Sequence, residues 1–353
     1  MYIDIAKEKL EKLKNKEDAI ILAIESSCDE TAAAVLKGKD IVLSNVIATQ
    51  IDIHKIYGGV VPEIASRQHI KAISPVVDSA LKEAGKTFDD IDAIAVTAGP
   101  GLVGALLVGV SYAKALAFAL GVPLIPVNHI EGHISGAFIS NAELTAPFLC
   151  LVVSGGHSEL VLVDKSMEYK KIGETRDDAI GECFDKVARV VGLTYPGGPQ
   201  IEKLAKDGDE NKYSFKSKFN DDLSHYDMSF SGIKTALINT IEKLERENIE
   251  YKKADIAASF QKDAMEILCK KTLAAAKDFK INKVAVAGGV SANKYLREKL
   301  KKYLDENDIE LYVPQMSYCT DNAAMIGRAA FESIKKGEYA DLTLNADPSW
   351  KIF

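Results

Sequence analysis

The 353-residue sequence contains little arginine and little proline, and its cysteines do not occur in pairs. Only six of its 44 basic residues are arginines, and the lysines are interspersed with 51 acidic residues. The resulting net charge of −7 excludes a bulk basic coat for nucleic acid. The five cysteines are widely spaced and include no CxxC pair. This spacing argues against a disulfide framework or a zinc ribbon and favours a reducing cytoplasm.

The N-terminal and apolar segments do not suggest a membrane protein. The first eighteen residues alternate acids and lysines without an apolar run, so we expect a short polar helix rather than a signal peptide. The longest apolar stretch, Gly101–Val127, could span a bilayer by length alone, but Lys114 lies at its centre. We therefore expect a helix buried in a globular fold, and no membrane.

The order of β-rich runs and helices suggests two related halves. At about 150 residues per domain the length predicts roughly two domains. Ile20–Ile24 leads into the polar turn ESSCDET, Phe148–Val153 leads into SGGHSE, and helices close each half. We predict an α/β fold of two lobes that meet near Ala146-Pro147, with the polar segment 206–222 as an exposed excursion of the second lobe.

Hydrophobic periodicity and turn signals place the individual elements. Helices are expected at Pro62–Ala84, Ile180–Val191, Pro199–Ala205, Phe230–Glu247 and Lys253–Lys277. Three more helices are expected with only one end defined: one begins after Asn128, one begins after Ala292, and the last one ends at Lys336. Further strands are expected at Ala32–Leu36, Asp40–Ile47, Ala93–Thr97, Pro123–Val127, Leu160–Val163, Val284–Ala287 and Leu311–Val313.

Two histidines in NHIEGH have the spacing of metal ligands. If Asn128 caps a helix, His129 and His133 lie one turn apart on the same face, where both imidazoles can reach one divalent ion. The alternative is two polar residues at a partly exposed helix start. Asp321, in the turn CTDN, is the candidate third ligand. Two histidines and one carboxylate leave coordination positions open and suit Fe(II) or Zn(II).

The same segment does not match a zinc protease. In the motif HExxH the catalytic glutamate follows the first histidine directly. Glu131 lies two places after His129, about 200° around a helix of 3.6 residues per turn. It therefore cannot act as the base of that mechanism, and the metalloprotease hypothesis loses its main support.

Three glycine turns could bind phosphate. The turns at Ser154-Gly155-Gly156, Gly197-Gly198 and Gly288-Gly289 would let backbone N–H groups approach an anion, although such turns are also common structural connections. The Walker and GxGxxG motifs are missing from the sequence, which excludes P-loop and dinucleotide sites. His157 fits loop scaffold and site lining equally well.

At this point the motifs together resemble one family. They occur in order between Ala19 and Ala340: IESSCDET (24–31), GPG (99–101), HIEGH (129–133), SGGH (154–157), SFSG (229–232), AGGVSAN (287–293) and TDN (320–322). This set resembles the universal tRNA threonylcarbamoyl-adenosine transferases, formerly labelled sialoglycoprotein endopeptidases. The SGGH loop makes the chain look like a bacterial-type member.

The resemblance implies the actin/Hsp70/sugar-kinase fold, with two RNase-H-like lobes and a nucleotide cleft between them. The implied organisation is a helical extension at 1–18, lobes at 19–146 and 147–320, and a segment 321–353 that brings a metal-ligand turn and a helix back to the first lobe. His129, His133 and Asp321 would bind the metal, which is iron in this family. Threonylcarbamoyl-adenylate would be bound by the residues Val152, Val153, Ser154, Gly155, Gly156, Asp185, Gly198, Glu202 and Asn293.

The implied reaction is the transfer of a threonylcarbamoyl group from threonylcarbamoyl-adenylate to the exocyclic amine of the adenosine beside the tRNA anticodon, with release of AMP. An actin-like paralogous protein and a small ATPase are the implied partners. The sequence does not identify the catalytic base, for which Asp185 is only a guess. The other hypotheses are an ATPase or small-molecule kinase of the same fold, the metalloprotease, and a scaffold that only binds nucleotide.

Overall fold

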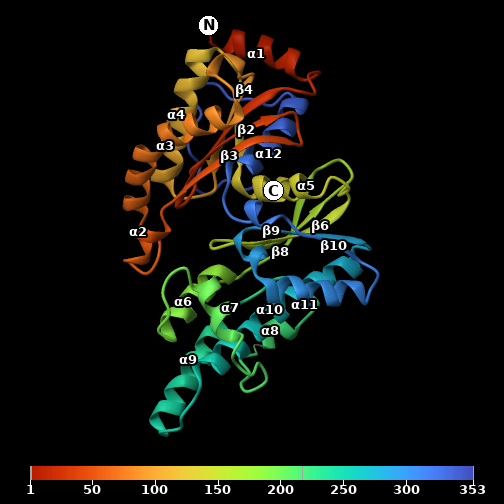
Figure 1. The fold of residues 1–353 in the computed structure, drawn as a ribbon. Coiled ribbons are helices and arrows are strands. Elements are labelled where there is room, and N and C mark those ends of the chain that lie inside the picture. Colours follow the sequence, from red (N-terminus) through yellow and green to blue (C-terminus); the bar gives the residue numbers. More distant parts are fainter. Residues whose placement is uncertain (1, 217, 353) are drawn as a thin grey trace. The chain divides into compact units, whose positions relative to one another are not determined.

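The computed structural model describes residues 2–216 and 218–352 (Figure 1). The described chain divides into two compact units. Unit 1 comprises residues 2–143 and 321–352, and unit 2 comprises residues 144–320. Met1 and Phe353, the first and last residues of the expected terminal segments, lie outside the described residues.

A mixed five-stranded sheet forms the centre of unit 1, with the strand order β3-β2-β1-β4-β5. Its strands are β1 (Ile20–Glu25), β2 (Glu30–Lys37), β3 (Ile41–Thr49), β4 (Ala93–Gly99) and β5 (Leu124–Asn128). The first three strands form an antiparallel meander, whereas β4 and β5 add in parallel. Every residue of β1 and β4 is buried, as expected for strands covered on both faces.

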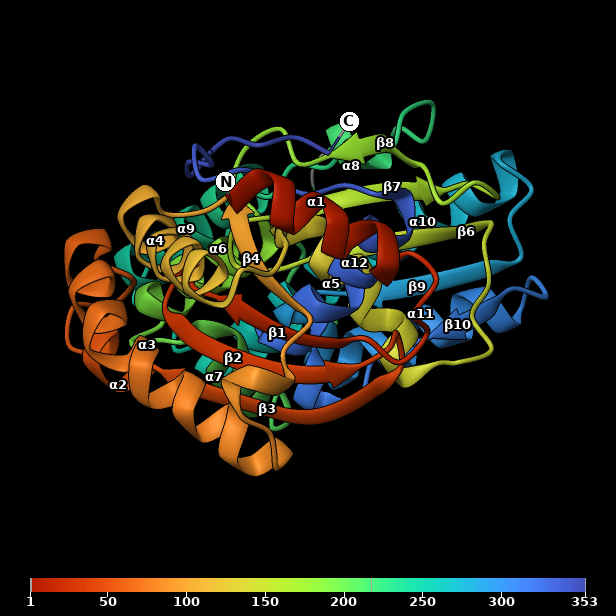
Figure 2. The same ribbon diagram turned by 90° about the horizontal axis from the view of Figure 1, so that it is seen from above.

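Helices cover both faces of this sheet (Figure 2). They are α1 (Tyr2–Leu13), α2 (Ile51–Lys55), α3 (Pro62–Ala84), α4 (Val103–Leu120), α5 (His129–Ser140) and α12 (Ala323–Lys336). Helices α3 and α4 pack on one side, and α12 packs on the other side together with α5. The predicted N-terminal helix is α1, and its Leu10 and Leu13 are buried.

Helix α4 is the apolar stretch that could be mistaken for a membrane span. It is long and apolar enough to cross a bilayer, and one third of its residues are buried within the fold. It packs on β4 and α3, and Lys114 donates a hydrogen bond to the carbonyl oxygen of Leu344 at 2.9 Å. The helix therefore packs within unit 1, but the prediction of a buried helix holds only for the third of its residues that face the sheet and α3.

Unit 2 repeats the strand connectivity of unit 1. Its strands are β6 (Phe148–Val153), β7 (Ser158–Val163), β8 (Tyr169–Glu174), β9 (Lys283–Ala287) and β10 (Glu310–Tyr312). In the order β8-β7-β6-β9-β10, the first three are again antiparallel and the last two are parallel. The two units are therefore related lobes, and this relation confirms the predicted fold class.

The helices of unit 2 follow the predicted pattern with small shifts at their ends. They are α6 (Ile180–Val190), α7 (Gly197–Ala205), α8 (Lys218–Asp221), α9 (Ser231–Arg246), α10 (Lys253–Asp278) and α11 (Lys294–Asp305). The segment 206–222 is more than an exposed excursion, because Phe215 is fully buried and belongs to the core of the unit. The prediction missed β8 and α8, which are short and polar.

The close packing of α12 on β2 can be tested by enlarging a glycine side chain at the contact. A Cβ atom at Gly327 would lie 2.4 Å from Cδ1 of Leu36, which is fully buried. We expect Gly327→Val to lower the free energy of unfolding by about 1–3 kcal/mol through overpacking. The single tryptophan, Trp350, packs against the unit 1 core, so its fluorescence in urea reports this unfolding.

The matched control is Gly198→Val, because a Cβ atom at Gly198 would meet nothing within 4 Å. We expect this variant to change the free energy by no more than about 0.5 kcal/mol. Equal stability of the two variants would contradict the close approach of α12 and β2.

Candidate metal centre and anion-binding loops

The predicted histidine pair lies at the start of α5. Asn128 caps this helix, and its Oδ1 accepts hydrogen bonds from the backbone N–H of Ile130 at 2.9 Å and Glu131 at 3.4 Å. His129 and His133 therefore follow each other by one turn, and their ring centroids are 4.6 Å apart. The predicted cap and helix are confirmed.

Asp321, the first residue of the second chain segment of unit 1, lies beside the histidine pair. Its Oδ1 lies 3.5 Å from Nε2 of His129 and 3.1 Å from Nε2 of His133. The candidate ligand atoms of the three residues lie within 4.8 Å of one another. Asp321 directly precedes Asn322, which caps α12, so two capped helix starts bring the three ligands together.

The chemistry of these residues fits a metal ion. His133 is 2% exposed, yet neither of its ring nitrogens makes a hydrogen bond among the described residues, and the only carboxylate oxygen that the ion pairs place beside Nε2 is Oδ1 of Asp321 at 3.1 Å. An unsatisfied buried polar group costs about 1–3 kcal/mol, and a cation bound at Nε2 would remove one such group. Two imidazole nitrogens and a carboxylate oxygen suit zinc or iron.

Acidic residues surround the cluster. Glu25 is fully buried, and its Oε2 lies 3.1 Å from Nδ1 of His129. Burial opposes the charged form of His129, but the adjacent carboxylates of Asp321 and Glu25 outweigh burial and raise its pKa to about 9. Burial and the charges of Asp29 and Asp321 raise the pKa of Glu30 to about 10. Glu30 is therefore neutral at pH 7, and the protonated His129 offsets part of the negative charge of its neighbours.

The sequence interpretation did not assign these acidic residues a role. They belong to ESSCDET, the motif that was read only as part of the family resemblance and as a turn after β1. Three carboxylates within six residues, from the last residue of β1 to the first residue of β2, are the one pattern in the sequence that points to them, and this pattern does not identify their partners.

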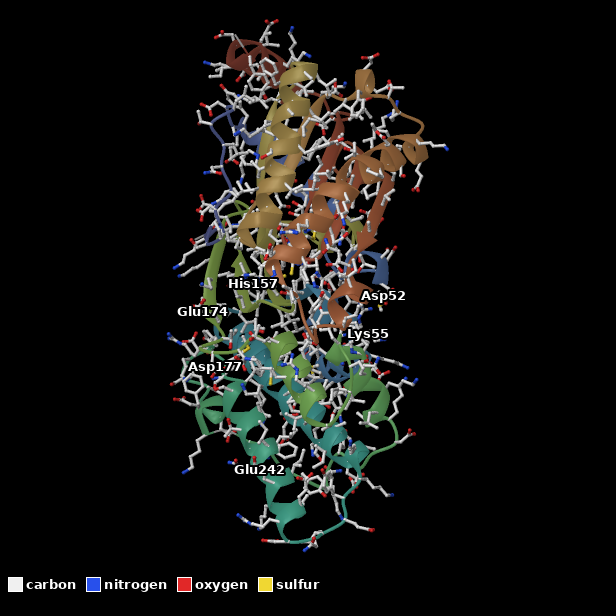
Figure 3. All side chains as sticks on the ribbon, turned by 90° about the vertical axis from the view of Figure 1, so that its left-hand side faces the viewer. Asp52, Lys55, His157, Glu174, Asp177 and Glu242 are labelled. Atoms are coloured by element: carbon white, nitrogen blue, oxygen red, sulfur yellow. The ribbon has the colours of Figure 1, made fainter. Side chains whose placement is uncertain are left out.

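The glycine turn after β6 in unit 2 is open. His157 closes it by two contacts with Ser154: the Ser154 N–H donates to the carbonyl oxygen of His157, and the His157 N–H donates to Oγ of Ser154. Gly155 and Gly156 are exposed, and a Cβ atom at either would meet nothing within 4 Å. Packing within the protein therefore does not require these glycines, whereas the close approach of a ligand would. Figure 3 labels His157 in this turn.

The other predicted ligand-binding residues of unit 2 lie near two helix starts. Oδ1 of Asp185 accepts a hydrogen bond from the Gly197 N–H at 2.6 Å and so holds the turn that contains Gly198. Oε1 of Glu202 accepts from the Lys294 N–H at 2.8 Å, and Asn293 caps α11. Glu202 also lines a cavity of about 350 Å³ together with Gln261, Lys294 and Tyr295. Val152 and Val153 end β6 and are fully buried, so only their backbone can face a ligand.

The motif SFSG is held in place by Asp177, which is labelled in Figure 3. Asp177 accepts hydrogen bonds from Oγ of Ser229 at 2.5 Å, from Oγ of Ser231 at 2.6 Å and from the Phe230 N–H at 2.8 Å. These contacts fix the two serines of the motif at the start of α9.

Comparison with known proteins identifies relatives over nearly the whole length. A family model described as "TsaD: tRNA N6-adenosine threonylcarbamoyltransferase" matches residues 41–328. A curated tRNA N6-adenosine threonylcarbamoyltransferase from Clostridium perfringens is 57% identical over 334 residues, which cover 94% of this chain and 98% of that protein. One from Clostridium botulinum is 56% identical over 338 residues, which cover 96% and 99%.

Solved structures of lower identity share the fold. Full-length HypF in its phosphate- and nucleotide-bound form matches with a TM-score of 0.62 at 18% identity, and the match covers 91% of this chain and 56% of the HypF chain. The activator of 2-hydroxyisocaproyl-CoA dehydratase from Clostridium difficile has a TM-score of 0.54 at 14% identity and covers 90% and 96%. These likenesses support the predicted actin/Hsp70-like fold.

Metal binding should depend on pH. In the metal-free protein His129 holds a proton up to about pH 9, and a metal must displace it. We expect the apparent affinity for Co(II) to rise about tenfold per pH unit from pH 6.5 to 8.5, measured by calorimetry in buffers of different ionisation enthalpy. His225→Ala should leave the dependence unchanged, and a flat affinity over this range would contradict the assignment.

Proposed function

Because this chain belongs to the TsaD family of tRNA N6-adenosine threonylcarbamoyltransferases, we propose that its donor is threonylcarbamoyl-adenylate and its acceptor the adenosine on the 3′ side of the tRNA anticodon. Membership makes the chain a tRNA-modifying transferase. The donor, the metal, the partners and the roles of single residues are the further content of the proposal. The His129–His133–Asp321 cluster, with its unsatisfied buried histidine, is the observation that carries it.

The proposed reaction needs no covalent nucleophile. The donor is a mixed anhydride of a carbamate and a phosphate, which is already activated. The amine nitrogen forms a bond to the carbamate carbonyl carbon, the bond from that carbon to the phosphate oxygen breaks, AMP leaves, and the amine loses one proton. The protein has to position the two substrates and stabilise the charge that develops on oxygen.

We assign the metal to unit 1. His129 and His133 would bind it through nitrogen, and Asp321 through a carboxylate oxygen. The bound metal, Fe(II) in our proposal with Zn(II) as the alternative, would supply Lewis acidity at the carbonyl of the donor. The two helix caps, Asn128 and Asn322, hold the ligands in place.

We assign the adenylate to unit 2. The backbone N–H groups of Gly155, Gly156 and Gly198 would bind the phosphate, because these glycines leave room for it, and Val152, Val153 and Ser154 would form the base of the site. Glu202 and Asn293 would bind the nucleoside: Asn293 caps α11, and Glu202 of α7 accepts a hydrogen bond from the N–H of Lys294, the first residue of α11. Asp185 supports the Gly197–Gly198 turn, and we retain it as the candidate that accepts the proton from the amine.

Partners and compartment complete the proposal. We propose an actin-like paralogous protein and a small ATPase as partners in the cytoplasm. The exposed apolar side chains of Ile70, Val103 and Leu107 on α3 and α4, beside a hollow of about 520 Å³, support a protein partner. The five free cysteines support a reducing compartment.

Transfer should be lost with the metal. We expect His133→Ala to bind no metal and to lower transfer from synthetic threonylcarbamoyl-adenylate to unmodified tRNA by more than about 100-fold, measured by mass spectrometry of the nucleosides. His225→Ala is the control, because this imidazole lies outside the cluster. The metal is identified by adding Fe(II) or Zn(II) to the wild-type chain after chelation and measuring which ion restores transfer. Full transfer by the metal-free wild type would refute the proposal.

The open glycine turn should be needed for binding and not for folding. We expect Gly155→Val to weaken binding of a non-hydrolysable adenylate analogue about 10- to 100-fold in calorimetry, since it fills the space of the phosphate, with an unchanged melting temperature. Gly288→Val should instead lower the melting temperature, because its Cβ atom would lie 2.4 Å from the carbonyl oxygen of Val153 at a φ of +87°. Unchanged affinity of Gly155→Val would remove this turn from the site.

A further inference from the structure

Glu25 is a fully buried carboxylate at the end of β1. Placing an ionised carboxylate in the interior costs several kcal/mol unless hydrogen bonds compensate, so its position requires an explanation. It lies between β2 and β4, its neighbours in the sheet, and its side chain is directed toward the histidine end of α5.

Three separate segments donate to this carboxylate. Oε1 accepts from the Ser27 N–H at 2.5 Å, in the loop after β1. Oε2 accepts from Oγ1 of Thr97 on β4 at 2.5 Å and faces Nδ1 of His129 at 3.1 Å. Both oxygens are thus engaged as acceptors, which is the pattern of an ionised carboxylate.

Two groups face Nδ1 of His129 at 3.1 Å, Oε2 of Glu25 and Oγ of Ser27, and only the carboxylate determines which ring nitrogen carries the proton, because a hydroxyl can either donate or accept. An ionised carboxylate can only accept, so Nδ1 of His129 must donate. In the neutral ring this leaves the lone pair on Nε2, the nitrogen that faces Asp321 and would bind the metal. On the other ligand, Nδ1 of His133 has no hydrogen-bond partner among the described residues. Among the two histidines, only His129 therefore has a carboxylate that contacts its Nδ1.

We propose that Glu25 is a positioning residue that fixes the metal-binding tautomer of His129 and places a negative charge behind it. This inference rests on the metal site of the proposed function. The expected consequence is tighter metal binding, since a carboxylate behind a ligating histidine raises its basicity and fixes its orientation.

Substitution by glutamine separates this role from packing. The glutamine oxygen can satisfy the Ser27 N–H, but its NH₂ group then faces Nδ1 of His129. Nδ1 would have to accept, which moves the proton to Nε2 and blocks the metal ligand. Thr97→Val is the matched control, because it removes a hydrogen bond to Glu25 and leaves the carboxylate beside His129.

The experiment uses the full chain, made metal-free by chelation and titrated with Co(II), whose visible absorption bands report its ligands. We expect Glu25→Gln to lower the Co(II) affinity about 10- to 100-fold and to shift the bands, and Thr97→Val to bind within about threefold of the wild type. Glu25→Asp, which keeps the charge, should recover part of the lost affinity. Melting temperatures of the metal-free variants monitor folding.

A second measurement needs no variant. In the zinc-loaded wild type with ¹⁵N-labelled histidine, NMR should show a proton on Nδ1 of His129 and zinc on Nε2. Zinc on Nδ1 would overturn the inference, as would wild-type affinity and bands in Glu25→Gln or an equal loss in Thr97→Val. A wild-type chain that binds neither Co(II) nor zinc would refute the metal site itself, and this inference with it.

Discussion

Carboxyl groups crowd together around the histidine pair of unit 1 and repel one another: Asp321 opposes the charge of Glu25, and burial with the charges of Asp29 and Asp321 raises the pKa of Glu30 to about 10, which leaves Glu30 neutral. Burial makes this repulsion strong, because the interior screens charge less than water does. The protein offsets part of it with local donors, as Glu25 shows with Ser27 and Thr97. The starts of α5 and α12 add the positive ends of two helix dipoles. A divalent cation held by His129 and His133 would complete the neutralisation.

The final segment returns to the first lobe and brings Asp321 to the histidine pair. Asp321 follows a chain that has passed through the whole of unit 2, and α12 then packs on β1, β2 and α5. The packing is close at Gly132, where a Cβ atom would lie 2.7 Å from Ile326, and at Gly327, where it would meet Leu36. Small residues on both helices thus allow α12 to approach near enough for Asp321 to face the histidines.

The sequence predicts those parts that depend on local signals. Asn128 is a residue type that caps helices, and the two histidines that follow it are spaced by one helical turn. Helix α3 begins at Pro62 and ends before Gly85 as predicted, because proline favours the first turn of a helix and glycine favours the position after its end. Glu25 carries no such signal. It ends a strand of apolar residues, and its partners Thr97 and His129 lie more than 70 positions away. Phe215 was missed for the same reason, since a lone aromatic in a polar segment does not reveal a distant core.

The protonation state of the buried cysteines bears on whether the proposed transfer could pass through a cysteine acyl-enzyme. Cys28 lies in the acidic turn, where burial and the charges of Asp29 and Asp321 hold the pKa of its thiol well above the usual value. Burial also raises the pKa of Cys183 and Cys269 to about 12. These thiols are protonated at neutral pH and are poor nucleophiles. These three thiols therefore offer no support for an acyl-enzyme intermediate, which agrees with the direct attack by the amine that we propose. In that proposal the capped helix starts and the open glycine turn would supply the positioning and the charge stabilisation that direct attack requires.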